Sequence, residues 1–270
     1  MTALAVSANE RSNGYGVVYA GTEPAALFRS EDGGTTWQDL SALRDLPSAP
    51  TWSFPPRPDS NLVRCITPDP HVAGRLFVAI EAGALVYSLD GGNNWYDRTP
   101  DSPFDTHTLL MHPLAPDRLY SAAGDGVRSP ERGYSESQDA GQTWWHPVEG
   151  RAYHYLWGMA IDSADPDTVL VSASPNAYKA HHAREAAAST IYRKTAAGVW
   201  YEVRDGLPST QGLIVPVLAS NVQEPHVFYA LTNKGLYRSP DAGVSWEQLP
   251  VAWHAAYHTQ HQQDLVVSTL

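Results

Sequence analysis

One short motif recurs along this sequence, and the repeat constrains the fold more than any other feature. A turn-forming stretch that ends in tryptophan occurs in four copies, which read FRSEDGGTTW, VYSLDGGNNW, SESQDAGQTW and LYRSPDAGVSW. A fifth copy, IYRKTAAGVW, keeps the glycine and the tryptophan but lacks the aspartate. The five tryptophans follow one another at intervals of 46 to 58 residues. Such intervals fit one four-stranded sheet per repeat, slightly larger than the roughly 40–45 residues of a WD40 blade.

Each motif lies between two short strand-like segments, so we expect it to form the turn of a β-hairpin. The aspartate should accept hydrogen bonds from nearby backbone N–H groups, and the following glycine should adopt a positive φ. The tryptophan ring should pack between adjacent sheets. The motif residues predicted to be structural are Asp32, Trp37, Asp90, Trp95, Asp139, Trp144, Asp241 and Trp246. One carboxylate per turn is far fewer than a calcium loop supplies, so no metal is predicted at these turns.

The pattern Ser-x-Asp-x-Gly-x-Thr-Trp is the Asp-box, or BNR repeat, and the chain resembles bacterial Asp-box β-propeller proteins over nearly its whole length. Sialidases, sortilin-type receptor domains, xyloglucan-active glycosidases and Ycf48-like photosystem II assembly factors are distant relatives in this group. The resemblance implies a β-propeller but no particular function, because the box is a structural device. Sialidase activity is not expected, since the sequence has no Arg-Ile-Pro motif.

A second recurrent unit precedes each box and consists of two apolar strands joined by a turn rich in Pro, Asp and Gly. The two units together predict an all-β propeller that forms a single domain over 1–270. Five complete four-stranded blades are predicted at about 3–40, 62–99, 106–148, 153–204 and 213–250. The remaining residues, 252–270, predict two strands of a partial sixth blade, so the propeller is expected to be six-bladed or a fragment of a seven-bladed one. An open edge at that incomplete blade would allow oligomerisation.

Composition argues against several classes of function. The net charge of −11 opposes binding to nucleic acid or to an anionic membrane, because both require a cationic surface. The single cysteine, Cys65, has no disulfide partner and belongs to no zinc motif. No stretch approaches the roughly 18 apolar residues that cross a bilayer, and the first residues lack the features of a secretory signal. We therefore expect a cytoplasmic protein, or a secreted one if a signal peptide has been removed.

The topology of a propeller sorts its loops onto two faces. The short turns within hairpins share one face with the boxes, whereas the loops between the second and third strands and between blades share the other. The long segments 41–61, 124–136 and 173–190 fall on this second face, which we expect to bind ligands. Glu23 and Glu81 each stand 14 residues before a box tryptophan and are expected at the mouth of the central channel.

Polar and aromatic side chains at matching positions are expected to complete a site for a small polar ligand. Arginine can grip a carboxylate, and an aromatic face can stack on a ligand. The candidate ligand-binding residues are Trp52, Arg57, Arg64, His107, Tyr155, Trp157 and His181. A water-filled channel whose charges pair across blades is the alternative interpretation. No metal or other cofactor is predicted, because the histidines lack nearby carboxylate or cysteine ligands at suitable spacing.

Two functions from different classes remain open. The favoured one is a non-catalytic binding or scaffold protein that binds a small polar ligand or a protein partner on the long-loop face. The alternative is a glycoside hydrolase in which Glu23 and Glu81 act as paired carboxylates, separated by roughly 6.5–9.5 Å as in inverting enzymes. Whether the chain is an enzyme stays undecided at this point. Ion pairing of both carboxylates would count against the hydrolase.

Overall fold

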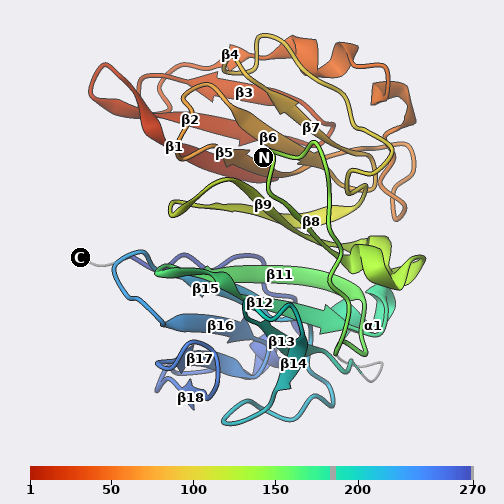
Figure 1. Cartoon of the computed structure of the whole chain (residues 1–270), viewed down its shortest axis with the longest axis vertical. Coiled ribbons are helices and arrows are strands. Elements are labelled where there is room, and N and C mark those ends of the chain that lie inside the picture. Colours follow the sequence, from red (N-terminus) through yellow and green to blue (C-terminus); the bar gives the residue numbers. More distant parts are fainter. Residues whose placement is uncertain (183–186, 269–270) are drawn as a thin grey trace. The chain divides into compact units, whose positions relative to one another are not determined.

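The computed structural model describes residues 1–182 and 187–268. Within these residues, eighteen strands form five sheets, and the strands of each sheet are hydrogen-bonded to their neighbours in chain order (Figure 1). The prediction of an all-β propeller is confirmed, and each of the five predicted repeats forms a sheet. Three of the sheets have the predicted four strands, whereas the second and third have three. In the second sheet the expected fourth strand is reduced to a single bridge between Tyr87 and Tyr96. No helix among the described residues has the length and apolar character needed to cross a membrane.

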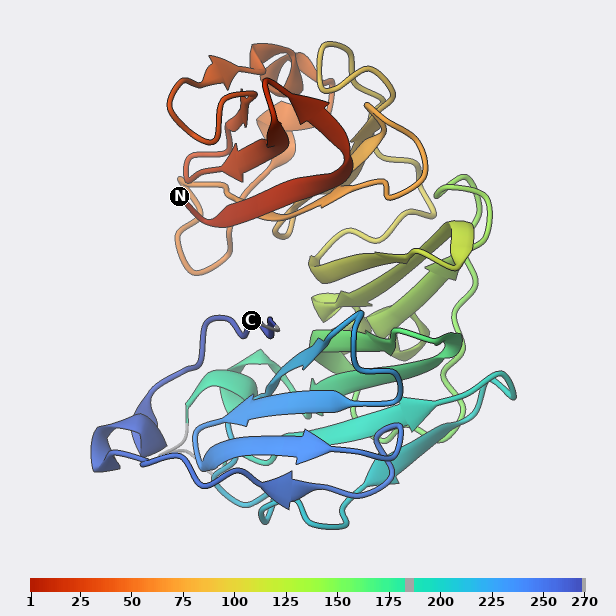
Figure 2. The same cartoon turned by 90° about the vertical axis from the view of Figure 1, so that its left-hand side faces the viewer.

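The first sheet contains β1 (Ala3–Ser12), β2 (Tyr15–Gly21), β3 (Leu27–Ser30) and β4 (Gln38–Asp39). The second contains β5 (Val63–Pro68), β6 (Leu76–Ile80) and β7 (Ala84–Ser88). The third contains β8 (Thr106–His112), β9 (Ala115–Ala123) and β10 (Tyr134–Ser137). The fourth contains β11 (Tyr155–Asp162), β12 (Asp165–Ser174), β13 (Thr190–Lys194) and β14 (Trp200–Val203). The fifth, seen with its strands side by side in Figure 2, contains β15 (Val217–Ser220), β16 (Phe228–Thr232), β17 (Gly235–Ser239) and β18 (Glu247–Gln248).

Short helices occupy the connections between strands. They are the α-helix α1 (Ala177–His181) and the 3₁₀ helices η1 (Ser41–Asp45), η2 (Ala49–Thr51), η3 (Gly124–Val127), η4 (Pro130–Gly133) and η6 (Ala255–Thr259). The predicted loop 41–61 is therefore ordered, and its Leu43 and Leu46 are buried in the same core as β6. Part of the predicted loop 173–190, residues 183–186, lies outside the described residues.

The chain divides into two compact units, each with its own core. Unit 1 comprises Met1–Ser121 and Glu136–Trp144, and unit 2 comprises Ala122–Ser135 and Trp145–Leu270. In unit 1 every residue of β6 is buried, because apolar side chains cover both faces of this central strand. The single domain predicted for 1–270 stays a prediction, and the two units are described separately below.

The four boxes share one pattern of hydrogen bonds, which the second sheet illustrates. Ser88 Oγ donates to Asp90 at 2.9 Å and accepts from the Gly92 N–H at 2.9 Å, while the Asn94 N–H donates to Asp90 at 2.9 Å. The same bonds recur around Asp32, Asp139 and Asp241. One glycine in each box adopts the positive φ that the turn requires, between 82° and 93°: Gly34, Gly92, Gly141 and Gly243. The predicted roles of the aspartates and glycines are confirmed.

The box tryptophans are less uniform than predicted. Trp246 is 5% exposed and packs in the core of unit 2, but Trp37 is 42% exposed, so the prediction that it is buried between sheets is wrong. The Trp37 indole donates to Gly34 O at 3.0 Å, and the Trp95 indole makes the same bond to Gly92 O at 2.9 Å. Trp95 is partly buried against the hydrophobic cluster of unit 1 that contains Leu76 and Val78. Trp144 is partly buried against a second cluster of the same unit, which contains Phe77 and Leu119.

The prediction of two strands in 252–270 is wrong for the described part of that segment. Residues 252–268 contain the helix η6 and no strand, and residues 269–270 lie outside the described residues. The segment is rich in His and Gln and lacks the alternation of a half-buried strand. Loop contacts hold it instead: Trp253 donates to Asn233 O at 3.1 Å, and the Asn233 amide donates to His258 O at 2.9 Å.

Candidate functional site

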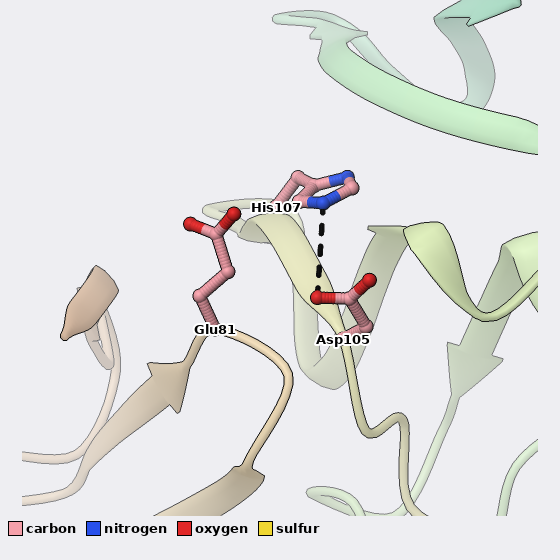
Figure 3. Close-up of side chains that lie close together, drawn as sticks. All are labelled: Glu81, Asp105 and His107. Carbon is pink, nitrogen blue, oxygen red and sulfur yellow. Dashed lines mark ion pairs between the residues drawn. The ribbon is translucent and has the colours of Figure 1, made fainter. Parts of the chain in front are cut away.

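Three side chains with metal- and proton-binding atoms meet at one end of the strands in unit 1. They are Glu81, Asp105 and His107, and one donor atom of each lies within 4.8 Å of the others (Figure 3). Glu81 directly follows β6, Asp105 directly precedes β8, and His107 is the second residue of β8. We call these three residues the charged cluster. Among the described residues, this group of His, Cys, Asp and Glu side chains is close enough to hold a metal ion.

The strand arrangement explains why these residues meet. In unit 1 strand β6 ends at the same end of the sheets at which β8 begins, and the two strands are in contact. Side chains two positions apart on a strand face the same side, so Asp105 and His107 both point towards Glu81. The Ala82 N–H donates to Asp105 Oδ1 at 2.9 Å and fixes that carboxylate against the turn after Glu81.

The electrostatic environment of Glu81 is unusual for a carboxylate. Its side chain is 11% exposed, and Arg64 Nε lies 3.7 Å from Oε2. Burial raises the pKa of Glu81 to about 7, the Arg64 charge opposes this shift, and the neighbouring Asp105 carboxylate adds to it. The Arg64 charge therefore only partly offsets the burial of Glu81, and the surroundings favour a proton or another cation on its carboxylate.

A second carboxylate, Glu23, lies at the exposed rim and is already engaged. Arg57 donates to both of its oxygens at 2.9 and 2.8 Å, and Ser60 Oγ donates at 2.8 Å. The hydrogen bonds from Arg57, then from Ser60, lower the pKa of Glu23 below its usual value. Both predicted catalytic carboxylates are thus in ion pairs, which counts against the pairing of Glu23 and Glu81 as acid and base; their catalytic role stays a prediction.

Trp52 was expected on the binding face, and the structure places it in the core of unit 1. Its side chain is 6% exposed, and its indole N–H donates to Ser48 Oγ at 2.9 Å. The ring packs close to Gly83 and supports the turn after Glu81. Trp52 therefore presents no free ring face to a ligand, because the helices η1 and η2 fold the long loop onto the sheet.

The remaining predicted residues lie in unit 2 and form an aromatic group of their own. Tyr155 Oη and His181 Nε2 are 2.9 Å apart, and the ring centres of Trp157 and His181 are 4.5 Å apart. His181 is the last residue of α1, whose first turn is capped by Asn176 accepting from the Lys179 N–H. The structure brings these three residues together, and their predicted role in ligand binding stays a prediction.

Sequence reasoning missed three residues at these sites. Asp105 belongs to the charged cluster of unit 1. Ser60 donates a hydrogen bond to Glu23 in the same unit. In unit 2 the ring centre of His261 lies 4.6 Å from that of His181. The position of Asp105 two residues before His107 was a usable signal, because alternate residues share a face. Ser60 and His261 belong to loops without a repeating pattern, and no comparable signal points to them.

Comparison with known proteins supports the fold. No protein-family model matches the sequence, and none of the curated proteins matches it either. The structure is similar to a GH74 enzyme from Niastella koreensis, with a TM-score of 0.65, 17% identity, and coverage of 95% of this chain and 38% of that one. An ancestral GH74 enzyme gives a TM-score of 0.64 at 14% identity, with coverage of 94% and 33%.

A third similar structure is YCF48 bound to a D1 peptide. Its TM-score is 0.56 at 12% identity, and the match covers 91% of this chain and 67% of that one. The chain spans well under half the length of the two GH74 enzymes that it matches. At these identities the likeness shows a shared β-propeller fold, which two groups of proteins with different activities possess.

Proposed function

We propose that this chain is a non-catalytic binding protein whose binding surface is the charged cluster of unit 1 together with Arg57 and Arg64. The observation that carries the proposal is the convergence of both charge signs at one end of the blades. Arg64 from β5, Glu81 after β6, and Asp105 and His107 around β8 come from three separate strands and meet within a few ångströms.

The surroundings of this surface favour a polar ligand that presents both donors and acceptors. Arg57 is 59% exposed and can add a charge-assisted hydrogen bond at the rim, while the side chain of His107 is almost fully buried. A peptide backbone with polar side chains has both kinds of group. The similar YCF48 structure contains a bound peptide, and this supports a peptide segment of a protein partner as the ligand class, with a small polar molecule as the second possibility for the test to distinguish.

The glycoside hydrolase is the less favoured function. It requires one carboxylate to attack or to activate water while the other donates a proton. Both oxygens of Glu23 already accept hydrogen bonds from Arg57, and one also accepts from Ser60, so this carboxylate is engaged before any substrate binds. We expect that the chain releases no chromophore from aryl glycosides above the uncatalysed rate. Turnover by the unmodified chain that is lost in Glu23→Gln would instead favour the glycoside hydrolase over the binding protein.

Peptides selected by phage display against the whole chain provide the probe for the binding proposal. The affinity of a selected peptide is measured by fluorescence anisotropy for the unmodified chain and for Arg64→Ala. Loss of a charge-assisted hydrogen bond is worth about 1.5–3 kcal/mol, so we expect affinity to fall at least tenfold. The matched control is Arg11→Ala, which removes an arginine at the opposite end of the first sheet and should leave the affinity unchanged.

One outcome would contradict the binding surface, and another would contradict the peptide as its ligand. One is a panel of selected peptides whose affinities are the same in Arg64→Ala and in the unmodified chain. The other is selection that yields no binder while a small polar molecule, such as an oligosaccharide, binds with Arg64 dependence. The second result would keep the surface but change the ligand class.

A further inference from the structure

We infer that Glu81, Asp105 and His107 form a binding site for one divalent transition-metal ion, of the class to which Zn²⁺ belongs. This inference goes beyond the proposed binding function and does not depend on it, because a metal can bind here whether or not a peptide does. It departs from the expectation from the sequence that no metal is bound, since that expectation found no carboxylate at suitable spacing from a histidine and overlooked Asp105.

The geometry of the three donors carries the inference. Their donor atoms lie within 4.8 Å of one another, and the His107 Nε2 to Asp105 Oδ1 distance is 3.8 Å. Two donors bound at about 2.0–2.2 Å from a zinc ion can be at most about 4.4 Å apart. Small side-chain rotations of Glu81, whose carboxylate is attached through two methylene groups, therefore bring all three donors onto one ion (Figure 3).

The types of donor select the class of metal. Imidazole nitrogen with two carboxylates suits zinc and its neighbours in the first transition series, whereas Ca²⁺ and Mg²⁺ prefer oxygen ligands alone. Three protein ligands would leave one coordination position for water or for a ligand group. The site would therefore add an electrophilic centre to a surface that otherwise relies on arginine to attract anionic groups.

The surroundings hold two of the donors in place. His107 has 2% of its side chain exposed, so its ring is held by packing, and Asp105 is oriented by the Ala82 N–H. Glu81 and Asp105 are two acidic groups side by side in a partly buried place, and a dication would neutralise both. Arg64 is compatible with such an ion, because a carboxylate has two oxygens and can bind a metal through one while keeping the arginine beside the other.

Isothermal titration of chelator-treated, tag-free whole chain with ZnCl₂ tests the inference. We expect one Zn²⁺ per chain, with affinity at least tenfold lower in each of Glu81→Gln, Asp105→Asn and His107→Gln. Titration with Co²⁺ gives a second readout, because its visible absorption spectrum reports the number and type of ligands and should change in His107→Gln. Circular dichroism confirms that each variant is folded.

Three control variants separate this site from other metal-binding groups. Asp45→Asn and His258→Gln remove an exposed carboxylate and an exposed imidazole, and neither should alter the affinity. His181→Gln removes one member of the imidazole pair in unit 2. The inference is overturned if no Zn²⁺ binds, if the three cluster variants bind as tightly as the unmodified chain, or if binding is lost in His181→Gln but kept in His107→Gln.

Discussion

The two ends of the blades in unit 1 are built in different ways. At one end each box turn forms the same set of hydrogen bonds among seven or eight consecutive residues, as the turn with Ser88, Asp90 and Gly92 illustrates. At the other end the charged cluster draws on residues that are far apart in the sequence and that differ from blade to blade. The repeated end uses its polar groups to stabilise a turn, and the varied end is where we propose that a ligand binds.

The carboxylates at the two ends differ accordingly. Hydrogen bonds from the Thr36 side chain and backbone lower the pKa of Asp32 to about 2, so this carboxylate has all the donors that it needs. Burial raises the pKa of Glu81 to about 7, and the neighbouring Arg64 charge only partly offsets this shift. The Asp32 carboxylate is stabilised in its charged form by its own turn, whereas the Glu81 carboxylate is destabilised in its charged form by burial.

The largest expected effect is at a box glycine. Gly92 has φ of 93°, and a Cβ there would lie 2.5 Å from Leu40 Cδ1 in the core. Left-handed strain and overpacking together should cost Gly92→Ala about 2–5 kcal/mol. Thermal unfolding measures this loss. Gly14→Ala is the matched control, since Gly14 has φ of 85° but no atom within 4 Å, and it should show the strain alone, about 1–2 kcal/mol. Equal losses in the two variants would show that the box does not pack as described.

A smaller loss is expected at the box serine. Ser88 is fully buried, and Ser88→Ala leaves the Gly92 N–H without its acceptor. An unsatisfied buried donor costs about 1–3 kcal/mol. Chemical denaturation measures the change, and Ser102→Ala, which removes a partly exposed hydroxyl in the same unit, should change stability much less. A loss as small as that of the control would mean that water replaces the serine.

Strong acid should remove the contribution of the box aspartate to stability. Asp32 has a folded pKa of about 2 against a usual value of 3.8, so its contribution is present above the usual value and is lost as pH falls through about 2. Asp32→Asn removes this dependence. Unfolding midpoints measured between about pH 5 and pH 2 should therefore converge for the two proteins as the pH falls. Parallel curves would contradict the assigned role of the carboxylate.

The smallest effect is expected at the rim of the opposite end. Arg57 is 59% exposed, and exposed ion pairs contribute about 0–1 kcal/mol. Arg57→Ala should thus leave the unfolding midpoint nearly unchanged, as measured by differential scanning calorimetry. A loss comparable with that of Ser88→Ala would show that the Glu23 and Arg57 pair supports the fold, which would remove the contrast between the two ends.

The sequence predicted the repeated end well because each box is local. The aspartate, the glycine and the strands on either side lie within a few residues, so composition and spacing were sufficient. The same repeat overestimated the uniformity of the tryptophans: Trp37 is 42% exposed although its indole makes the same hydrogen bond as that of the partly buried Trp95. The exposure of each indole therefore depends on the segments packed around its box, and the spacing of the boxes does not reveal these.

The varied end was predicted only in part. Matching positions in the repeats identified Glu81 and His107 as candidate site residues, since both stand at strand ends. Asp105 was missed because it precedes its strand. Trp52 was misplaced because a long loop was read as exposed, whereas its apolar residues fold it back onto the sheet. The two strands expected in 252–270 were wrong because their prediction extended the repeat beyond the last box.

The most direct test of the central claim, that the two ends separate stability from binding, is a paired measurement on Arg64→Ala and Ser88→Ala. Calorimetry gives the affinity for one display-selected peptide and the unfolding midpoint of each variant. The account predicts that Arg64→Ala loses at least tenfold in affinity, about 1.4 kcal/mol or more, with little change in midpoint, and that Ser88→Ala unfolds at lower temperature but binds normally. Affinity that follows the midpoint in both variants, or that is unaffected by Arg64→Ala, would contradict it.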